Sequence, residues 1–259
     1  MNILVTNDDG IRAESLWALV RELVHIGKVT VAAPDRERSA VGTAVTLFQP
    51  LHADEYESPV PGVQAWAVDG TPSDCTILAL GALVVEKTDI VVSGINPNVN
   101  LGEDVHISGT VGGALQGYFR GLPAIAVSAP PGSPEGTHAA AVIAARLAEG
   151  LVSARPARAF INLNVPDRPL DSIAGVRLTR LARASHINTV AEDTSGPKRQ
   201  YHMTRMRLPD FQDSGTDIEA IDQGYVSMTP LYSSLLDKPP QRLLKKLCTE
   251  IEKSLPGRM

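Results

Sequence analysis

The sequence is poor in cysteine, and its histidines are scattered. Only Cys75 and Cys248 occur among 259 residues, which excludes a disulfide framework and a metal site built from clustered cysteines. The six histidines show no metal-ligand spacing, which argues against zinc. There is no long apolar run, and no basic, secretion-type leader precedes the first acidic pair. We therefore expect a cytoplasmic protein with no membrane partner.

The charge balance excludes another class of partner. The chain has 24 Lys and Arg residues against 29 Asp and Glu, a net charge of −5 at pH 7. Such a chain has no general attraction for nucleic acid, so we expect none as a partner. Hydrophobic residues make up 43% and charged residues 20%, proportions that allow a sizeable core. A phosphate site here would need local positive charge from a metal ion, from helix N-termini or from a few Arg and Lys.

Three motifs of common nucleotide-binding and hydrolase folds are also missing. The Gly-x-Gly-x-x-Gly fingerprint does not follow the first predicted strand, where Asp8-Asp9-Gly10 stands instead. The chain contains no Gly-x-Ser-x-Gly elbow, and no Gly-Lys-Ser/Thr follows the glycine-rich stretch that begins at Gly109. These absences exclude a dinucleotide-binding Rossmann motif, an α/β-hydrolase nucleophile and a P-loop.

The sequence does contain a regular alternation of short apolar strands and amphipathic helices up to about Pro166. Strands are predicted at 2–6, 28–33, 64–68, 89–93, 124–128 and 159–163. Helices are predicted at 16–24, at 73–83 with Ser73 or Asp74 as the cap, at 108–119 and at 138–151. This alternation predicts an α/β fold with a Rossmann-like, doubly wound, mostly parallel sheet.

The pattern changes after Pro166, so we divide the chain into a catalytic domain at 1–166 and a second part at 167–259. No helical face is visible from Asp167 to about Asp237. Residues 176–181 and 199–208 are predicted to form two antiparallel strands of a long hairpin, and a C-terminal helix follows at 241–255. A two-stranded hairpin cannot bury its own apolar face. We therefore predict an oligomerisation arm that docks on a neighbouring subunit.

Asp8 and Asp9 are the first candidate site residues. Two adjacent carboxylates raise one another's pKa unless a positive group lies between them, and the carboxyl end of a parallel strand is where α/β proteins bind ligands. Ser39 and Asn96 follow later strands and would lie at the same sheet edge. A polar turn or a loop cap would use the same residue types. Their joint placement favours a shell of Asp8, Asp9, Ser39 and Asn96 for Mg²⁺, Mn²⁺ or Ca²⁺.

A second candidate site begins the helix predicted at 108–119. Ser108, Gly109 and Thr110 put small and hydroxyl residues at a helix N-terminus, where free N–H groups and the helix dipole favour phosphate. Tight packing of the helix on the sheet would require small residues as well. We assign these three residues, together with Asn7, to phosphate binding.

These motifs resemble the SurE (stationary-phase survival protein) family, in order and over most of the chain. The matching stretches are 7–10, 33–39, 70–75, 92–96, 100–102, 108–111, 162–166 and 224–231. The resemblance implies a metal-dependent 5'-nucleotidase that hydrolyses nucleoside monophosphates, with some members acting on 3'-nucleotides or short polyphosphate. It implies metal ligands at Asp8, Asp9, Ser39 and Asn96, and a dimer or tetramer with exchanged C-terminal elements.

The sequence departs from the family pattern at a few positions. Glu14 and Ser15 stand where Pro and Gly are usual, Asn98 replaces Gly, Ile107 replaces an aromatic residue, and Gln116 replaces Glu. Because Asn tolerates a positive φ, the loop at Asn98 is expected to survive. Ile107 and Gln116 affect the expected substrate preference and rate, and leave the metal shell unchanged.

We therefore expect hydrolysis of nucleoside 5'-monophosphates to nucleoside and phosphate, with one divalent ion per subunit, most simply Mg²⁺ or Mn²⁺. Either Asp8 or Asp9 is the catalytic group, as a base that orients water or as a nucleophile, and the sequence leaves this choice open. The alternative is a nucleotide- or phosphate-sensing module that binds without turnover.

Overall fold

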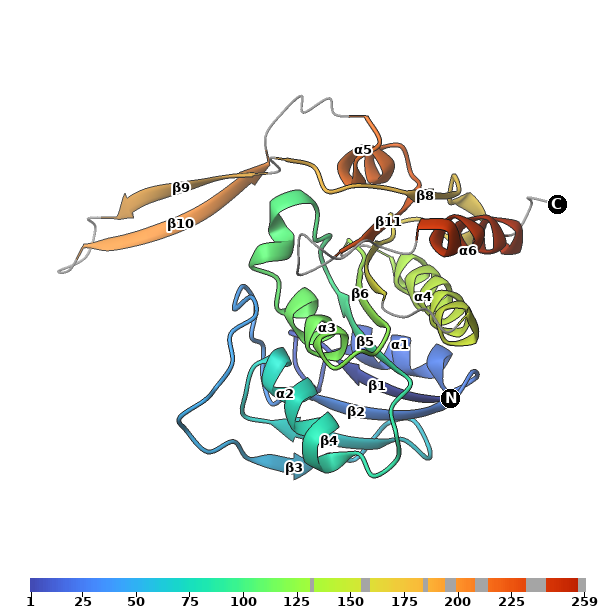
Figure 1. Cartoon of the computed structure of the whole chain (residues 1–259). Helices are drawn as coiled ribbons and strands as arrows, with labels where there is room; N and C mark the ends of the chain where they lie inside the picture. The colour runs from blue at the N-terminus through green and yellow to red at the C-terminus, as the bar shows by residue number, and fades with distance from the viewer. Residues whose placement is uncertain are drawn as a thin grey trace.

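A nine-stranded, mostly parallel sheet organises the protein (Figure 1). The computed structural model describes residues 1–130, 133–154, 159–183, 186–193, 199–207, 214–231 and 241–255. Six parallel strands form the centre of the sheet: β1 (Asn2–Thr6), β2 (Lys28–Pro34), β4 (Gln64–Val68), β5 (Ile90–Asn96), β6 (Ala124–Ser128) and β7 (Phe160–Asn164). The short strand β3 (Ala53–Glu55) is antiparallel to β4 at one edge. This confirms the predicted α/β class.

The strand order β3-β4-β2-β1-β5-β6-β7-β11-β8 contains one reversal that matters for function. From β1 the chain moves outward through β2 to β4, and it then returns to place β5 on the other side of β1. In register, Thr6 at the end of β1 lies beside Ser93 of β5. A crevice forms at such a switch point because the loops after the two neighbouring strands diverge to opposite sides.

Helices cover both faces of the sheet. On one face lie α1 (Glu14–Leu23), α4 (Pro134–Ala154) and α6 (Gln241–Ser254), and on the other α2 (Pro72–Leu78) and α3 (Gly109–Phe119). The alternation of side chains along β1 explains this arrangement: Ile3 and Val5 join the core beneath α1 and α4, whereas Leu4 joins the core beneath α2. All three are buried, as expected of a parallel strand covered on both sides.

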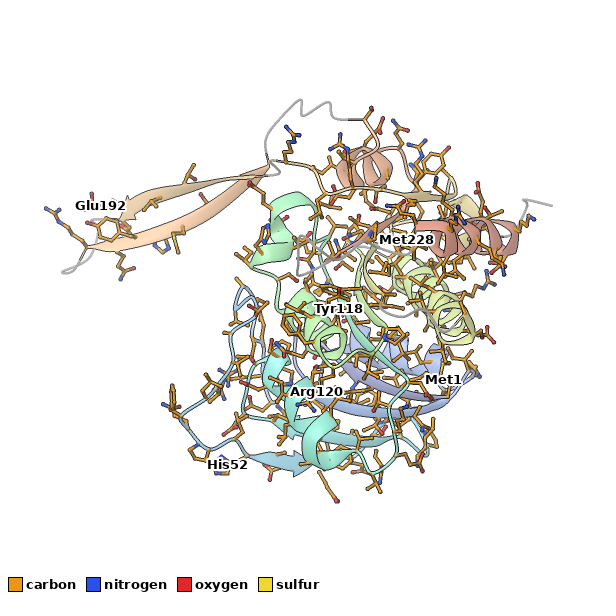
Figure 2. The ribbon with its side chains drawn as sticks, viewed as in Figure 1. Met1, His52, Tyr118, Arg120, Glu192 and Met228 are labelled. Atoms are coloured by element: carbon orange, nitrogen blue, oxygen red, sulfur yellow. The ribbon has the colours of Figure 1, made fainter. Side chains whose placement is uncertain are left out.

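Two details of the helices on the second face differ from the sequence prediction or add to it. The cap of α2 is Thr71 and not Ser73 or Asp74: the Thr71 side chain accepts from the Asp74 N–H, and the Asp74 side chain accepts from the Thr71 N–H. The sequence prediction placed the cap after Pro72. Because Pro is favoured as the first helical residue, the cap comes before it, at Thr71. Near the C-terminal end of α3, Tyr118 (labelled in Figure 2) stacks on Phe160 of β7, with ring centroids 5.5 Å apart.

The predicted hairpin exists, but one of its strands was assigned wrongly. It consists of β9 (His186–Asp193) and β10 (Gln200–Arg207), which pair antiparallel. Residues 176–178 instead form β8 (Val176–Leu178), which pairs in parallel with β11 (Val226–Pro230). Buried Val176 explains the difference, because the main sheet covers an apolar side chain that a free hairpin would leave exposed. Leu208 and part of the intervening polar stretch, 194–198, lie outside the described residues.

The C-terminal part also contributes to the main sheet. β11 pairs antiparallel with β7, and α6 packs on α4 and β8. A short helix, α5 (Asp217–Asp222), lies in the stretch that was predicted to lack helix, and it was missed because two turns are too short to show an apolar period. The division at Pro166 remains a proposal about roles. Within the described ranges, no helix is both long and apolar enough to cross a bilayer.

The hairpin of β9 and β10 projects away from the body of the protein, with Glu192 near its outer end (Figures 1 and 2). Val190, Tyr201 and Met203 are 62%, 59% and 82% exposed. Val190 lies opposite Met203, and Tyr201 lies opposite Glu192. Because side chains of paired and alternate residues share a face, the three exposed apolar side chains lie on one face of the hairpin.

Candidate functional site

Three segments meet at the carboxyl end of β1. The loop after β2 contacts the loop after β1, where the Arg38 N–H donates to the Asp8 carbonyl over 2.7 Å. The first turn of α3 reaches the same residue, since the Thr110 hydroxyl donates to Asp8 Oδ1 over 2.5 Å. The end of β5 adjoins this point through its register with β1. Asp8 therefore lies where the loop after β2 and the first turn of α3 meet, next to the switch point of the strand order.

Asp8 is held in place and shielded from water. Its side chain is 4% exposed. Burial raises the pKa of this carboxyl above the ordinary value, and the hydrogen bond from Thr110 opposes that effect. A buried carboxylate whose donors, the hydroxyl and main-chain N–H of Thr110, are neutral favours a further positive partner.

One oxygen of the Asp9 carboxylate lacks a hydrogen-bond donor in the described part of the chain. Its Oδ2 is buried and has no hydrogen-bond partner among the described residues. Burial, followed by the negative charges of Asp8 and Glu37, raises the pKa of Asp9 to about 7. A bound cation would remove the repulsion and supply the missing partner, so the pair fits a hard divalent ion.

Ser39 and Asn96 lie on the loops that flank Asp8 and Asp9. The hydroxyl of Ser39 is exposed and donates to Glu37 over 2.7 Å, which leaves its lone pairs available. Asn96 ends β5, and its side-chain N–H donates to the Asn98 carbonyl, so its Oδ1 is the group that can go to a cation. Nowhere in the described ranges do three or more His, Cys, Asp or Glu side chains gather as a competing metal cluster.

The first turn of α3 approaches Asp8 closely because residue 109 is glycine. A Cβ at Gly109 would lie 2.8 Å from the Asp8 Cβ and 3.2 Å from the Arg38 carbonyl. Ser108 caps the helix, accepting from the Val111 N–H over 3.1 Å. The glycine therefore allows the helix start to pack tightly against Asp8, and phosphate binding at this turn stays a prediction.

Asn7 shapes the turn that presents the two carboxylates. It is fully buried, and its side chain donates to the Gly10 carbonyl over 3.0 Å and accepts from the Gly10 N–H over 3.2 Å. Gly10 has φ +96°, and a Cβ there would lie 2.9 Å from the Arg36 backbone. The turn therefore requires glycine and is closed by the asparagine amide.

The chain matches a known protein family over most of its length. The model of the family described as "Survival protein SurE" matches residues 3–188. The chain belongs to the SurE family.

Individual SurE relatives match over most of their length. A protein of Dehalococcoides mccartyi (strain CBDB1) named 5'-nucleotidase SurE is 48% identical over 242 residues, which cover 92% of this chain and 91% of the relative. A 5'-nucleotidase SurE of Moorella thermoacetica is 44% identical over 247 residues, covering 94% and 95%. The crystal structure of the SurE protein from Aquifex aeolicus superposes with a TM-score of 0.77 at 32% identity, covering 95% of this chain and 98% of that one.

The departures from the SurE pattern leave the crevice intact. Asn98 is not among the described residues with positive φ, so the tolerance of Asn for that region is not needed; its Oδ1 accepts from the Val99 N–H over 3.0 Å. Ile107 is 41% exposed, and its carbonyl accepts from the Gly42 N–H. Gln116 is half-buried on α3. The change at Glu14 and Ser15 leaves α1 capped by Ala13 without a side-chain hydrogen bond.

Sequence reasoning missed an amide network beside the site. The Asn100 N–H donates to Asn164 Oδ1, its side chain donates to Ser128, and its carbonyl accepts from Asn162 and Asn164, all at 2.8–3.1 Å. The available signal was two asparagines two residues apart in the apolar strand β7, where side chains on one face must find buried partners.

Proposed function

We propose that the protein hydrolyses nucleoside 5'-monophosphates to nucleoside and phosphate, using one divalent ion per subunit, Mg²⁺ or Mn²⁺. The names of the relatives support the activity. The observation that carries the metal dependence is the unpartnered Oδ2 of Asp9 beside buried Asp8 at the switch point of the sheet. A cation relieves the repulsion between two such carboxylates, whereas a polar turn without a ligand leaves that repulsion uncompensated.

The proposed shell consists of Asp8, Asp9, Ser39 and Asn96, an all-oxygen donor set that suits Mg²⁺ or Mn²⁺. When bound, the ion supplies charge neutralisation at the phosphoryl group and a lowered pKa for an attacking water. Thr110 fixes Asp8, whereas Asp9 has a free oxygen. Of the two catalytic candidates, Asp9 is therefore the better one for orienting or deprotonating a water, and Asp8 the better fixed ligand.

Phosphate is proposed to bind at the first turn of α3. Ser108 caps an 11-residue helix that begins with Gly109 and Thr110, and the dipole of this helix stabilises negative charge at its N-terminus. The hydroxyl and the main-chain N–H of Thr110 both donate to Asp8, so this residue would act by holding Asp8 beside the phosphate. The side chain of Asn7 is occupied by Gly10, so Asn7 would act through its main chain or by holding the turn.

A turnover assay tests this function. The protein is stripped with EDTA, and phosphate release is measured from 5'-AMP, 5'-GMP, 5'-CMP, 5'-UMP, 3'-AMP and tripolyphosphate, with and without Mg²⁺ or Mn²⁺. We expect metal-dependent release from the 5'-nucleotides. The 3'-nucleotide and tripolyphosphate show whether the wider activity of some family members extends to this chain. Nucleotide binding without any phosphate release would replace the enzyme by the sensing module.

The bond from Thr110 to Asp8 gives a second expectation. Thr110→Val keeps the shape of the buried side chain and removes its hydroxyl, so Asp8 loses that donor and keeps the main-chain N–H of residue 110. A hydrogen bond to a charged group contributes about 1.5–3 kcal/mol, so we expect kcat/KM to fall by about 10- to 100-fold. Steady-state kinetics on 5'-AMP measure this, and Thr110→Ser, which keeps the hydroxyl, is the matched control. Unchanged kinetics in Thr110→Val would leave this contact without a catalytic role.

We also propose a homodimer or homotetramer in the cytoplasm, assembled through the hairpin of β9 and β10. The support for assembly is the exposed apolar side chains of Val190, Tyr201 and Met203, which lie on one face of the hairpin. The support for the location is the scarcity of cysteine.

A further inference from the structure

The loop at 97–108 connects the two proposed halves of the site. It begins after Asn96, a proposed metal ligand, and ends at Ser108, which caps the proposed phosphate-binding helix. The loop includes one short helical turn, η2 (Gly102–His106). Because both ends carry proposed site residues, whatever fixes this loop also fixes the spacing between metal and phosphate.

One buried carboxylate fixes the loop near its middle. Asp217 is fully buried, and its Oδ2 accepts from the Gly102 N–H over 2.7 Å. Its Oδ1 accepts from the N–H groups of Ala182 and Ile218, each over 2.9 Å. All three partners are main-chain donors, so a carboxylate satisfies them and a neutral amide, with its own N–H₂ group, cannot satisfy all of them.

The Asp217 carboxylate also links the described residues that precede and follow the hairpin of β9 and β10, which we call the roots of the hairpin. Ala182 lies shortly before β9, and Asp217 follows β10 as the first residue of α5. The roots are also joined directly, because the Arg180 N–H donates to the Gly215 carbonyl and the Asp217 N–H donates to the Arg180 carbonyl, at 3.1 and 3.0 Å. The described residues on either side of the hairpin are therefore joined to one another, and Asp217 joins them to the loop.

An apolar cluster covers this junction. Leu101 of the loop packs with Ala182 and Ile218, and all three are buried. Val99 and Ile221 are partly buried against them. Packing and hydrogen bonds thus hold together three segments of the chain, of which Gly102 and Asp217 are 115 positions apart in the sequence.

We propose that Asp217 is a positioning residue: it ties the loop at 97–108 to the roots of the hairpin and thereby sets the spacing between the metal shell and the phosphate-binding helix. This rests on the proposed function, since Asn96 and Ser108 are assigned by it. Asn100 anchors the loop independently to β6 and β7, so Asp217 adjusts a loop that stays attached without it.

Asp217→Asn tests the proposal, with Asp171→Asn as the matched control. Asp171 is an exposed carboxylate whose side chain accepts from Ser172. The measurements are KM and kcat on 5'-AMP, the Kd for Mn²⁺ by calorimetry without substrate, and the Tm. We expect Asp217→Asn to raise KM and the Mn²⁺ Kd by about tenfold, because the loop ends shift. The control should stay within about twofold of the original protein in all of them.

The outcomes separate positioning from general stability. A lowered Tm with KM and Mn²⁺ Kd unchanged would overturn the proposal and leave Asp217 a structural residue. If Asp217→Asn does not fold, Ile221→Ala is the second variant, because it loosens the edge of the same apolar cluster and keeps the Asp217 carboxylate. Unchanged KM and Mn²⁺ Kd in Ile221→Ala would also overturn the proposal. If the original protein binds Mn²⁺ but releases no phosphate, the proposed function is wrong. The Mn²⁺ Kd of the variants then still tests whether Asp217 positions the loop at 97–108.

Discussion

We expect Asp9→Asn to abolish metal-dependent phosphate release while the protein remains folded. The substitution changes the carboxylate whose Oδ2 has no partner among the residues that the structure describes, and which we assign to the metal and to the attacking water. The loss should reach about 10³-fold or more, the upper range for removing one group that stabilises transition-state charge. The measurement is phosphate release from 5'-AMP over a range of Mg²⁺ concentrations, together with Mn²⁺ binding by calorimetry.

The stability of the metal-free protein is the internal check on this variant. The pKa of Asp9 is raised from 3.8 to about 7, so between these values the folded state binds more protons than the unfolded state. The free energy of unfolding of the metal-free protein therefore falls as the pH rises through this window. Asn does not titrate, so we expect Asp9→Asn to flatten this fall. It should be at least as stable as the original protein above about pH 7.

Two further variants complete the Asp9 experiment. Asp8→Asn should lose turnover in the same way, because Asp8 is the proposed fixed ligand. Glu37→Gln is the control, since Glu37 is an exposed neighbour that raises the pKa of Asp9 without belonging to the proposed shell. A well-folded Asp9→Asn protein with near-normal turnover at low metal concentration would refute the assignment.

The second large effect concerns assembly. We expect the intact protein to form a dimer or tetramer, and removal of the hairpin at 186–207 to give a monomer. His186 and Arg207 are register partners, so a short Gly-rich linker can replace the hairpin without stretching the body. Light scattering measures both masses. A monodisperse 27.6 kDa monomer of the intact chain at micromolar concentration would show that the hairpin does not mediate assembly.

Excising the hairpin is a sharper test than cutting the chain near Asp167. Such a cut would remove β8 and β11 from the main sheet and expose the edge of β7, so aggregation would follow whatever the hairpin does. Point variants refine the experiment further. Met203→Lys places a charge on the apolar face and should dissociate the assembly, because burying an unpaired charge is costly.

The matched control for Met203→Lys is its neighbour His202→Lys, on the opposite face of the same strand. Thr189 and Thr204 share that opposite face and are hydrogen bonded to one another at 2.6 Å, as expected of a solvated surface. We expect His202→Lys to assemble normally. Dissociation by both lysines would mean that charge on the hairpin, and not the apolar face, controls assembly.

Much of the sheet was predictable because its signals are local. Each central strand is a short buried run, and each is followed by a helix with its own apolar period, so the order of elements predicts the parallel sheet. The placement of Asp8, Asp9, Ser39 and Asn96 at one edge follows from that order, because each comes at or after the carboxyl end of a strand in the same sheet. Their roles remain proposals for the experiments above.

Other features depend on contacts between distant segments, and these the sequence could not supply. The strand at 176–178 looked like one half of a hairpin, because alternation predicts a strand and does not choose its partner. α5 is too short for a periodic signal, whereas the Thr71 cap is a local feature that Thr71 and Asp74, with Pro72 between them, could have indicated.

By itself the sequence determined the fold class and the alternation of strands and helices, and it predicted which residues could bind a cation, since these follow from periodicity and residue chemistry. Only the tertiary structure decided which groups satisfy one another. Thr110 donates to Asp8 across 102 residues, Asp217 binds Gly102 across 115, and Asp9 keeps a buried oxygen with no partner among the described residues. The reason is physical: a hydrogen bond depends on distance and direction in space, and these are set by how separate elements pack.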